Sequence, residues 1–407
     1  MNKFRDTTIV LGVTGGIACA KASSLASALT KAGADVHVVM TKAACEFVSE
    51  LTFRTITGND VSVDMFAKPE EWNVKHISLA QRADLFIIAP ATANFIGKVA
   101  NGIADDLLTT TVMATKVPVI IAGAMNDNMY TNPIVAANIE KLKGLGYYFC
   151  GPESGVLACK TEGIGRMSEP EQILNYAYHV SIGKDRSSLA GKRVLITSGP
   201  TYEPLDPVRY IANRSSGKMG YALAYAALVR GASVCVVTGP TSLIDPPQEI
   251  ELVKVESANQ MCLAVEDKAK EADIIIGAAA VADYRPAEYA SEKLKKDEND
   301  YVLELTKNPD ILATVSEEST SADKVIVGFA AETSDILLNA SLKVKNKGLD
   351  FIVANGVKEE SPFGSDYNAV TLIFANGRNS FIEKTYKELI AHKILDACVD
   401  EIAKKVN

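Results

Sequence analysis

Glycines follow the first strand-like run of the chain, at a position where backbone groups can bind an anion. The run Thr14-Gly15-Gly16-Ile17 comes after a short apolar stretch and before an alanine-rich helical pattern. Free N–H groups and the dipole of a helix N-terminus favour a negative group there. The spacing is not G-x-G-x-x-G, so a dinucleotide is not indicated, and a tight turn that glycine permits explains the same residues.

Two further loops have compositions that suit a ligand. Small residues in the run 90–94 let a flat ring approach the backbone, and Asn94 can hydrogen-bond to polar ring edges. An ordinary loop with a helix cap accounts for that run equally well. The run 214–219 has Gly217 and Lys218 but places Met219 where a Walker A loop needs Ser or Thr. A P-loop ATPase is therefore excluded, although a helix start there can still bind phosphate.

Cysteine and histidine spacing argues against a metal centre. No two of the seven cysteines have C-x-x-C spacing, and no two of the four histidines lie at helical ligand spacing. Taken alone, Cys159 reads as a small buried side chain and His76 as a core or capping residue. An imidazole can also position a carboxylate or shuttle a proton near neutral pH. Glycines around Cys159, at 155, 163 and 165, fit a lid.

The elements that would position these residues alternate in two similar halves. Strand-like apolar runs occupy 8–13, 36–40, 85–89 and 117–122, and then 193–197, 233–237, 274–278, 325–329, 351–354 and 369–374. Helical patterns separate them, including 17–31, 216–230 and 384–405. Such alternation predicts an α/β protein with two Rossmann-like, doubly wound domains and mainly parallel sheets. A polar stretch at 183–188 sets the expected domains at 1–188 and 189–407.

Composition narrows the function classes. The chain has 407 residues, a length that suits two domains of roughly 150 residues or more. Its net charge of −8 disfavours a nucleic-acid backbone as a partner. The longest apolar runs fall short of the ~18 residues that span a bilayer, and no signal peptide is visible. We therefore expect a cytoplasmic protein that binds neither nucleic acid nor membrane.

Short motifs in both halves together resemble one family, the bacterial bifunctional phosphopantothenoylcysteine decarboxylase/phosphopantothenate–cysteine ligases of coenzyme A biosynthesis. The resemblance covers essentially the whole chain. In the first half the motifs are 14–18, 76–79, 90–94, 105–108, 124–126 and 157–159. In the second half they are 198–201, 206–209, 213–217, 279–283, 292–296, 307–310 and 328–332. Each motif is weak alone, and their shared order makes the resemblance specific.

For the first half, the resemblance implies a flavodoxin-like, FMN-dependent decarboxylase. The flavin would contact Gly15, Gly16, Ile17, Thr41, Phe47, Pro90, Ala91, Thr92, Ala93 and Asn94. His76 would position the carboxylate or move a proton, and Cys159 would return a proton in the reductive half of the reaction. Asn126 would bind the substrate carboxylate, with Ala124 and Met125 beside it. Arg166 would contact a substrate phosphate.

For the second half, the resemblance implies a ligase that joins cysteine to 4′-phosphopantothenate through an acyl-cytidylate. CTP would be the co-substrate, and Mg²⁺ or Mn²⁺ would neutralise its triphosphate. Lys293 would stabilise charge on the reacting phosphate, although composition alone makes it a solvated lysine in a charged run. Asn213 would hold the intermediate, with Arg209 nearby. The expected nucleotide contacts are Gly277, Ala278, Ala279, Asp283, Lys293, Pro309, Asp310, Ile311, Leu312, Phe329, Lys343 and Lys347, with Asp283 also a possible metal ligand.

The resemblance also implies a homo-oligomer, with trimers of the flavin domain, dimers of the ligase domain, and both together in a dodecamer. A neighbouring subunit would complete the flavin site. Three alternatives stay open at this point. An NAD-linked oxidoreductase is opposed by the missing G-x-G-x-x-G. A flavin-binding regulatory subunit, or an enzyme with one decayed half, is opposed by the retention of His76, Asn126, Cys159 and Lys293.

Overall fold

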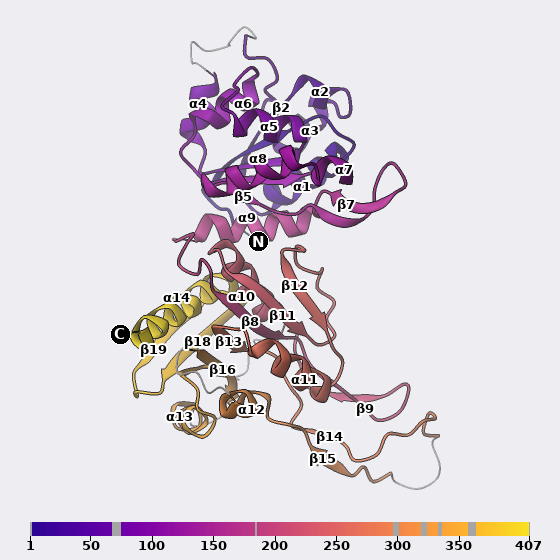
Figure 1. Ribbon diagram of the computed structural model, residues 1–407, viewed down its shortest axis with the longest axis vertical. Helices are drawn as coiled ribbons and strands as arrows, with labels where there is room; N and C mark the ends of the chain where they lie inside the picture. The colour runs from indigo at the N-terminus through magenta and orange to yellow at the C-terminus, as the bar shows by residue number, and fades with distance from the viewer. Residues whose placement is uncertain are drawn as a thin grey trace. The chain divides into compact units, whose positions relative to one another are not determined.

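The computed structural model describes residues 2–66, 75–183, 185–295, 301–318, 324–332, 336–356 and 364–406. Contacts divide the chain into two compact units, which Figure 1 draws in one ribbon. The first is Met1–Ile182 with Pro247–Glu249, and the second is Gly183–Pro246 with Ile250–Asn407. Three residues of the second half of the sequence therefore belong to the first unit.

The first unit has a five-stranded parallel sheet in the order β2-β1-β3-β4-β5, the order of flavodoxin-like folds. Its elements are β1 (Thr8–Val13), α1 (Cys19–Lys31), β2 (Asp35–Met40), α2 (Lys42–Cys45), α3 (Glu50–Thr57), α4 (Lys75–Arg82), β3 (Leu85–Ala91), α5 (Ala93–Ala100), α6 (Leu107–Ala114), β4 (Val119–Gly123), α7 (Asp127–Tyr130), α8 (Pro133–Gly144), β5 (Tyr148–Phe149), β6 (Glu153–Val156), β7 (Glu162–Arg166) and α9 (Pro170–Ile182). All seven residues of β3 are buried, as expected for a central strand covered on both faces.

The second unit has an eight-stranded sheet in the order β12-β11-β8-β13-β16-β17-β18-β19. Its elements are β8 (Arg193–Ser198), β9 (Tyr202–Pro204), β10 (Tyr210–Ala212), α10 (Lys218–Val229), β11 (Ser233–Thr238), β12 (Ile250–Lys254), α11 (Ala258–Ala269), β13 (Ile274–Gly277), β14 (Tyr284–Pro286), β15 (Leu305–Lys307), α12 (Ile311–Glu318), β16 (Val325–Glu332), α13 (Ile336–Asn346), β17 (Phe351–Gly356), β18 (Tyr367–Phe374), β19 (Asn379–Tyr386) and α14 (Lys387–Val406). Only the pairings of β18 are antiparallel among the strands of this sheet.

Alternation along the central strands gives this sheet two cores. Val194 and Ile196 of β8 pack in one cluster with side chains of α10 and α14, whereas Leu195 packs in another with α11, α12 and α13. Successive side chains of a strand point to opposite faces, so a wholly apolar strand needs helices on both sides. The predicted α/β class with mainly parallel sheets is confirmed.

Some element bounds differ from the prediction. The last helix was expected from 384 but begins at Lys387, because 384–386 end the edge strand β19. Neither β12 nor β19 was predicted, since most of their side chains are exposed or half-buried and the apolar pattern is weak. Residue 296 of the predicted lysine motif lies outside the described residues. Within the described chain, no helix has the length and apolar character that crossing a membrane requires.

Candidate active sites

A cavity of about 1170 Å³ opens at the carboxyl ends of β1, β3 and β4, in the first unit. Parallel strands end at one edge of their sheet, so the loops that follow them meet there. Most of the residues predicted for flavin and substrate line it: Gly15, Gly16, Ile17, Thr41, Thr92, Ala93, Asn94, Ala124, Met125, Asn126, Cys159 and Arg166. Predicted residues from six separate stretches of the sequence therefore converge on one site.

The remaining predicted residues of this half lie elsewhere. Pro90 and Ala91 are buried in β3, behind the cavity wall. Phe47 is 51% exposed and lies on a separate hollow lined by residues 45–51 and Arg54. His76 is half-buried in α4 and does not line the cavity. Within one chain, the cavity thus lacks the predicted histidine.

The loop after β1 presents unused backbone donors. In the described chain, the N–H groups of Gly15, Gly16 and Ile17 have no hydrogen-bond partner. A Cβ on Gly15 would lie 2.5 Å from the Cβ of Ala43, so glycine is required for the close approach of the two loops. These donors precede α1, a helix of 13 residues, and form a site that suits a phosphate.

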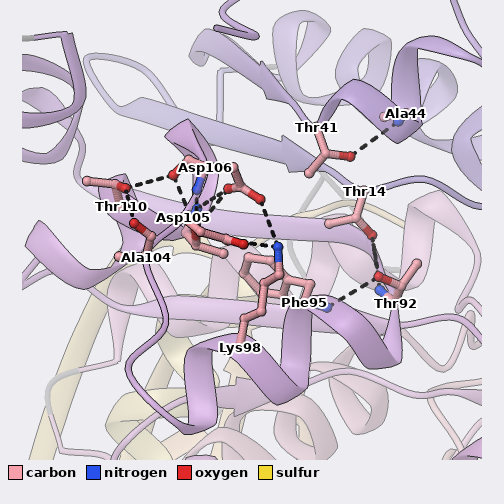
Figure 2. A network of polar contacts seen from close by, with 11 residues as sticks. Thr14, Thr41, Ala44, Thr92, Phe95, Lys98, Ala104, Asp105, Asp106 and Thr110 are labelled. Carbon is pink, nitrogen blue, oxygen red and sulfur yellow. Dashed lines mark hydrogen bonds and ion pairs between the residues drawn. The ribbon is translucent and has the colours of Figure 1, made fainter. Parts of the chain in front are cut away.

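Thr14 ties this loop to the one after β3, as Figure 2 shows. Its hydroxyl donates to the carbonyl oxygen of Pro90 at 2.8 Å and accepts from the N–H of Thr92 at 3.0 Å. Thr92 in turn caps α5 through its side chain, which accepts from the N–H of Phe95. Asn94 is therefore held on a short, capped helix beside the glycine loop.

An ion-pair cluster lines the same cavity, and the sequence reasoning gave it no role. Lys98 Nζ lies 2.7 Å from Asp105 Oδ1 and 3.6 Å from Asp106 Oδ2 (Figure 2). The hydrogen bond with Asp105 raises the pKa of Lys98, and the same bond lowers the pKa of Asp105. Asp106 also caps α6 by accepting the N–H of Thr109. The 105–108 motif was the available signal for this cluster.

The hairpin of β6 and β7 carries Cys159 over the cavity. The Asn126 amide donates to Cys159 Sγ at 3.5 Å, and Thr161 Oγ1 lies 2.9 Å from the same sulfur. The pKa of Cys159 is lowered, mainly by its hydrogen bond with the Thr161 side chain. All seven cysteines lie in the described ranges, and Cys159 is the exposed one among them. A thiol of this kind can exchange a proton with a ligand.

Gly165 allows the hairpin to lie close to the loop after β4. Its φ is +151°, and a Cβ there would lie 2.1 Å from the carbonyl oxygen of Met125. The N–H of Met125 donates to the carbonyl oxygen of Gly165 at 3.0 Å. Arg166, next in the chain, pairs with Glu169, which also accepts from Lys21. The predicted lid is thus fastened at its base while its tip carries the thiol.

The second unit has its own cavity of about 1020 Å³, again at the carboxyl ends of strands. The predicted residues that line it are Asn213, Gly277, Ala278, Ala279, Asp283, Pro309, Asp310, Ile311, Leu312, Phe329, Lys343 and Lys347. A Cβ on Gly277 would lie 2.7 Å from Leu312, so glycine admits α12 against β13. Lys347 Nζ pairs with Asp310 Oδ2 at 2.8 Å on the cavity wall.

Hydrogen bonds hold the loop after β13 in place. Asn213 donates from its amide to the carbonyl oxygen of Val281 at 2.8 Å. Asn308 donates likewise to the carbonyl oxygen of Ala282, and the hydroxyl of Thr201 accepts from the N–H of Ala282. Asp283 follows directly. Among the described residues, no three His, Cys, Asp or Glu side chains form a group that could hold a metal ion.

Several cavity residues were not assigned in advance. Asn355 lines the cavity, and its Oδ1 is buried without a hydrogen-bond partner in the described chain. Lys387 is 7% exposed, and burial together with the nearby Lys218 lowers its pKa. In contrast, Arg209 and Lys293 do not line the cavity. Arg209 lies in the turn between β9 and β10, and Leu294, which follows Lys293, is hydrogen-bonded to that turn.

Comparison with known proteins decides the family. Residues 2–180 match the family described as Flavoprotein, and residues 189–402 match the DNA/pantothenate metabolism flavoprotein C-terminal domain. The chain is 46% identical over 393 residues to the Coenzyme A biosynthesis bifunctional protein CoaBC of Bacillus subtilis (strain 168), covering 96% of each chain. The chain belongs to the CoaBC family. It is also 46% identical to the CoaBC protein of Vibrio vulnificus (strain CMCP6), over 93% of this chain and 94% of the relative.

Among solved structures, the C-terminal domain of a CoaBC protein matches at 38% identity with a TM-score of 0.46, covering 54% of this chain and 100% of that one. The family resemblance drawn from the motifs is confirmed. As a CoaBC protein, the chain is a bifunctional decarboxylase and ligase that catalyses two consecutive steps of coenzyme A biosynthesis, a ligation and a flavin-dependent decarboxylation. Its first unit is the flavoprotein domain.

Proposed function

We propose that the first cavity binds FMN and decarboxylates 4′-phosphopantothenoylcysteine, and that the second ligates cysteine to 4′-phosphopantothenate with CTP. The observation that carries the first assignment is the pair of Asn126 and Cys159 over a cavity whose floor is the glycine loop. The order of reactions follows from the chemistry, since the amide must exist before its cysteine carboxylate can be lost. The use of CTP fits a cytoplasmic enzyme.

The residues of the first cavity fit FMN. The three free N–H groups of Gly15, Gly16 and Ile17 suit its phosphate, and the small side chains of Thr92 and Ala93 leave room for its ring, with Asn94 available to a polar edge. When bound, the flavin supplies an oxidant for the thiol end of the substrate, which makes loss of CO2 possible. Side chains of the chain itself orient the substrate and move its protons.

Three further roles in this half fall to Asn126, Cys159 and Arg166, which line the cavity. Asn126 orients the substrate carboxylate through its amide, and Cys159 returns a proton after CO2 has left. Arg166, at the base of the lid, binds the phosphate end of the substrate. His76 lies outside the cavity of its own chain, which supports a site completed by a neighbouring subunit of a trimer. Exposed apolar side chains at the cavity, Ile17 at 68% and Phe66 at 88%, support the same arrangement.

In the second cavity, lysines surround the space for a triphosphate. Lys343 and Lys347 contribute positive charge, Phe329 offers a ring to the base, and Asn213 holds the acyl-cytidylate. Asp283 is the one predicted protein ligand for Mg²⁺ or Mn²⁺. Mg²⁺ characteristically binds one or two carboxylates together with substrate phosphates, so the nucleotide would supply most of the ligands. Lys293 then stabilises charge on the reacting phosphate, and Arg209 acts beside it.

Exposed aromatic side chains support dimers of the ligase half. The hairpin of β9 and β10 and that of β14 and β15 lie beside one another in Figure 1, and both extend from the main sheet. Tyr210, Tyr284 and Tyr289 are each about half exposed on them. Large exposed apolar patches characteristically mark interfaces. Trimers of one half and dimers of the other would together form a dodecamer.

The test supplies purified protein, whose flavin is identified by absorbance and mass, with 4′-phosphopantothenate, cysteine, CTP and Mg²⁺. Pyrophosphate and CO2 are followed separately, and the final product should be 4′-phosphopantetheine. Lys293→Ala should lose pyrophosphate release yet still decarboxylate preformed 4′-phosphopantothenoylcysteine, and Cys159→Ala should show the reverse. Bound flavin without pyrophosphate or CO2 would instead support a regulatory flavoprotein.

A further inference from the structure

A buried carboxylate holds the turn that carries Arg209. Asp206 is 2% exposed, and its Oδ1 accepts the N–H groups of Val208 and Arg209, both at 2.8 Å. Its Oδ2 lies 3.2 Å from Nε of Arg209. Burial raises the pKa of Asp206, but the backbone N–H groups and the Arg209 charge lower it further, so it stays below its ordinary value. The carboxylate is therefore charged at neutral pH and well supplied with donors.

The second oxygen of this carboxylate also holds a distant segment. Asp206 Oδ2 accepts the N–H of Leu294 at 3.2 Å, and the Arg209 guanidinium donates to the carbonyl oxygen of the same residue. Both polar groups of Leu294 are thus bound by one ion pair. A third bond joins the same two segments, from the N–H of Ala290 to the carbonyl oxygen of Leu205 at 3.0 Å. Lys293 directly precedes Leu294, so its backbone is fixed to the turn.

The two oxygens of Asp206 serve separable purposes. The turn closes through its backbone, where the N–H of Leu205 donates to the carbonyl oxygen of Arg209 at 2.8 Å, and through Oδ1. Oδ2 lies 3.2 Å from Nε of Arg209 inside the turn, and it also reaches across to the N–H of Leu294. The two backbone N–H groups of the turn use Oδ1 alone, so the bond from Oδ2 to Leu294 points to a purpose beyond local folding.

We propose that Asp206 is a positioning residue of the ligase, which clamps the backbone beside Lys293 to Arg209 so that the two cations act as one preformed unit. The inference rests on the proposed roles of those two residues. Both lie outside the nucleotide cavity of their own chain, and neither is held by the cavity wall. The clamp therefore fixes the backbone beside Lys293 to the turn that carries Arg209.

The test uses Asp206→Asn in the full-length protein. Asparagine keeps an acceptor for the turn but places an NH₂ group against the N–H of Leu294. We expect trypsin to cleave the Lys293–Leu294 bond about tenfold faster, read by mass spectrometry, because the peptide is released from the clamp. The kcat of ligation should fall about 10- to 100-fold while the KM for CTP stays within about twofold, because the cavity is untouched. Decarboxylation of preformed substrate should not change.

Asp245→Asn is the matched control, because it also removes a carboxylate from an ion pair of this unit, with Lys254 at 2.7 Å. It should alter neither readout. If Asp206→Asn fails to fold, Arg209→Lys is the second variant. It keeps the positive charge but loses the guanidinium group that donates to the carbonyl oxygen of Leu294, so it should raise cleavage of the same bond. Where both variants fold, their effects on cleavage should not be additive.

Two results would overturn the proposal. One is an unchanged cleavage rate in both variants, which would mean that the clamp does not hold the segment. The other is faster cleavage with an unchanged kcat of ligation, which would make the clamp purely structural. Lys293→Ala separates this from failure of the proposed function: full ligation by that variant would remove Lys293 from the reaction, whatever Asp206→Asn does to cleavage.

Discussion

The Nδ2 group of Asn126 lies 3.5 Å from Sγ of Cys159 and donates a hydrogen bond to it, across 33 positions of sequence. The asparagine caps the short helix α7, and the cysteine lies on the hairpin of β6 and β7. The two groups that we propose to orient the substrate carboxylate and to give a proton are therefore paired before any substrate binds. Preformed geometry of this kind lowers the entropy cost of reaching the transition state.

Replacing Thr161 with valine should raise the pKa of Cys159. The Thr161 side chain is the main cause that lowers it, and valine keeps the shape without the hydroxyl. Alkylation of Cys159 by iodoacetamide, followed by mass spectrometry between pH 6 and 10, should shift to higher pH. The other six cysteines, which are buried or half-buried, serve as internal controls. An unmoved profile would show that the hydroxyl does not stabilise the thiolate.

A methyl group at position 165 should disable the lid. In Gly165→Ala the Cβ would lie 2.1 Å from the carbonyl oxygen of Met125, at a φ of +151° that alanine rarely adopts. We expect the hairpin to move by about an ångström and decarboxylation of preformed substrate to slow about 100-fold, with ligation retained. Gly144→Ala is the control, because its Cβ meets nothing within 4 Å at the end of α8. Equal decarboxylation by both variants would contradict this account.

Glu249 should make part of the first unit sensitive to pH. Its carboxylate accepts the N–H of Gly151 at 2.7 Å, and burial raises its pKa from the ordinary 4.5 to about 7. Glu153 raises it as well, whereas Lys143 lowers it. Between pH 4.5 and about 7, the folded form therefore binds more protons than the unfolded form does. The contribution of Glu249 to the free energy of unfolding is fully present below pH 4.5 and is lost as pH rises through 7. The loss is at most about 3 kcal/mol.

Hydrogen exchange of the Gly151 amide measures this effect, after correction for the intrinsic dependence of exchange on pH. Protection should be greater at pH 6 than at pH 8. Glu249→Gln cannot ionise, so its protection should be level over that range. If wild type and variant show the same pH profile, Glu249 does not titrate near neutrality.

Lys347 should contribute directly to nucleotide affinity. Its ammonium lines the second cavity and pairs with Asp310 at 2.8 Å. Removing one charged hydrogen bond costs about 1.5–3 kcal/mol, so Lys347→Ala should raise the KM for CTP about tenfold or more. Decarboxylation should stay unchanged. The control is Lys345→Ala, which removes an exposed lysine of α13 outside the cavity and should leave the KM for CTP unchanged. If both variants raised the KM for CTP equally, the cause would be the general loss of positive charge.

The strands that position both sites were predictable because their signal is local. A continuous apolar run such as that of β3 can only be buried on both faces, and glycine after β1 permits the turn into α1. The edge strands β12 and β19 escaped prediction, because exposed side chains carry little apolar pattern. The helix expected from 384 began three residues late for the same reason.

The sequence by itself determined the fold class and the family, and most of the site residues predicted from it line the two cavities, because apolar periodicity and short motifs are local properties. Only the tertiary structure decided that Arg209 and Lys293 lie outside the second cavity, and that Leu294, next to Lys293, is bound to Arg209 and Asp206. It alone assigned Pro247–Glu249 to the first unit. These relationships join segments about 90 residues apart, and hydrogen bonds over such distances leave no spacing in the sequence to read.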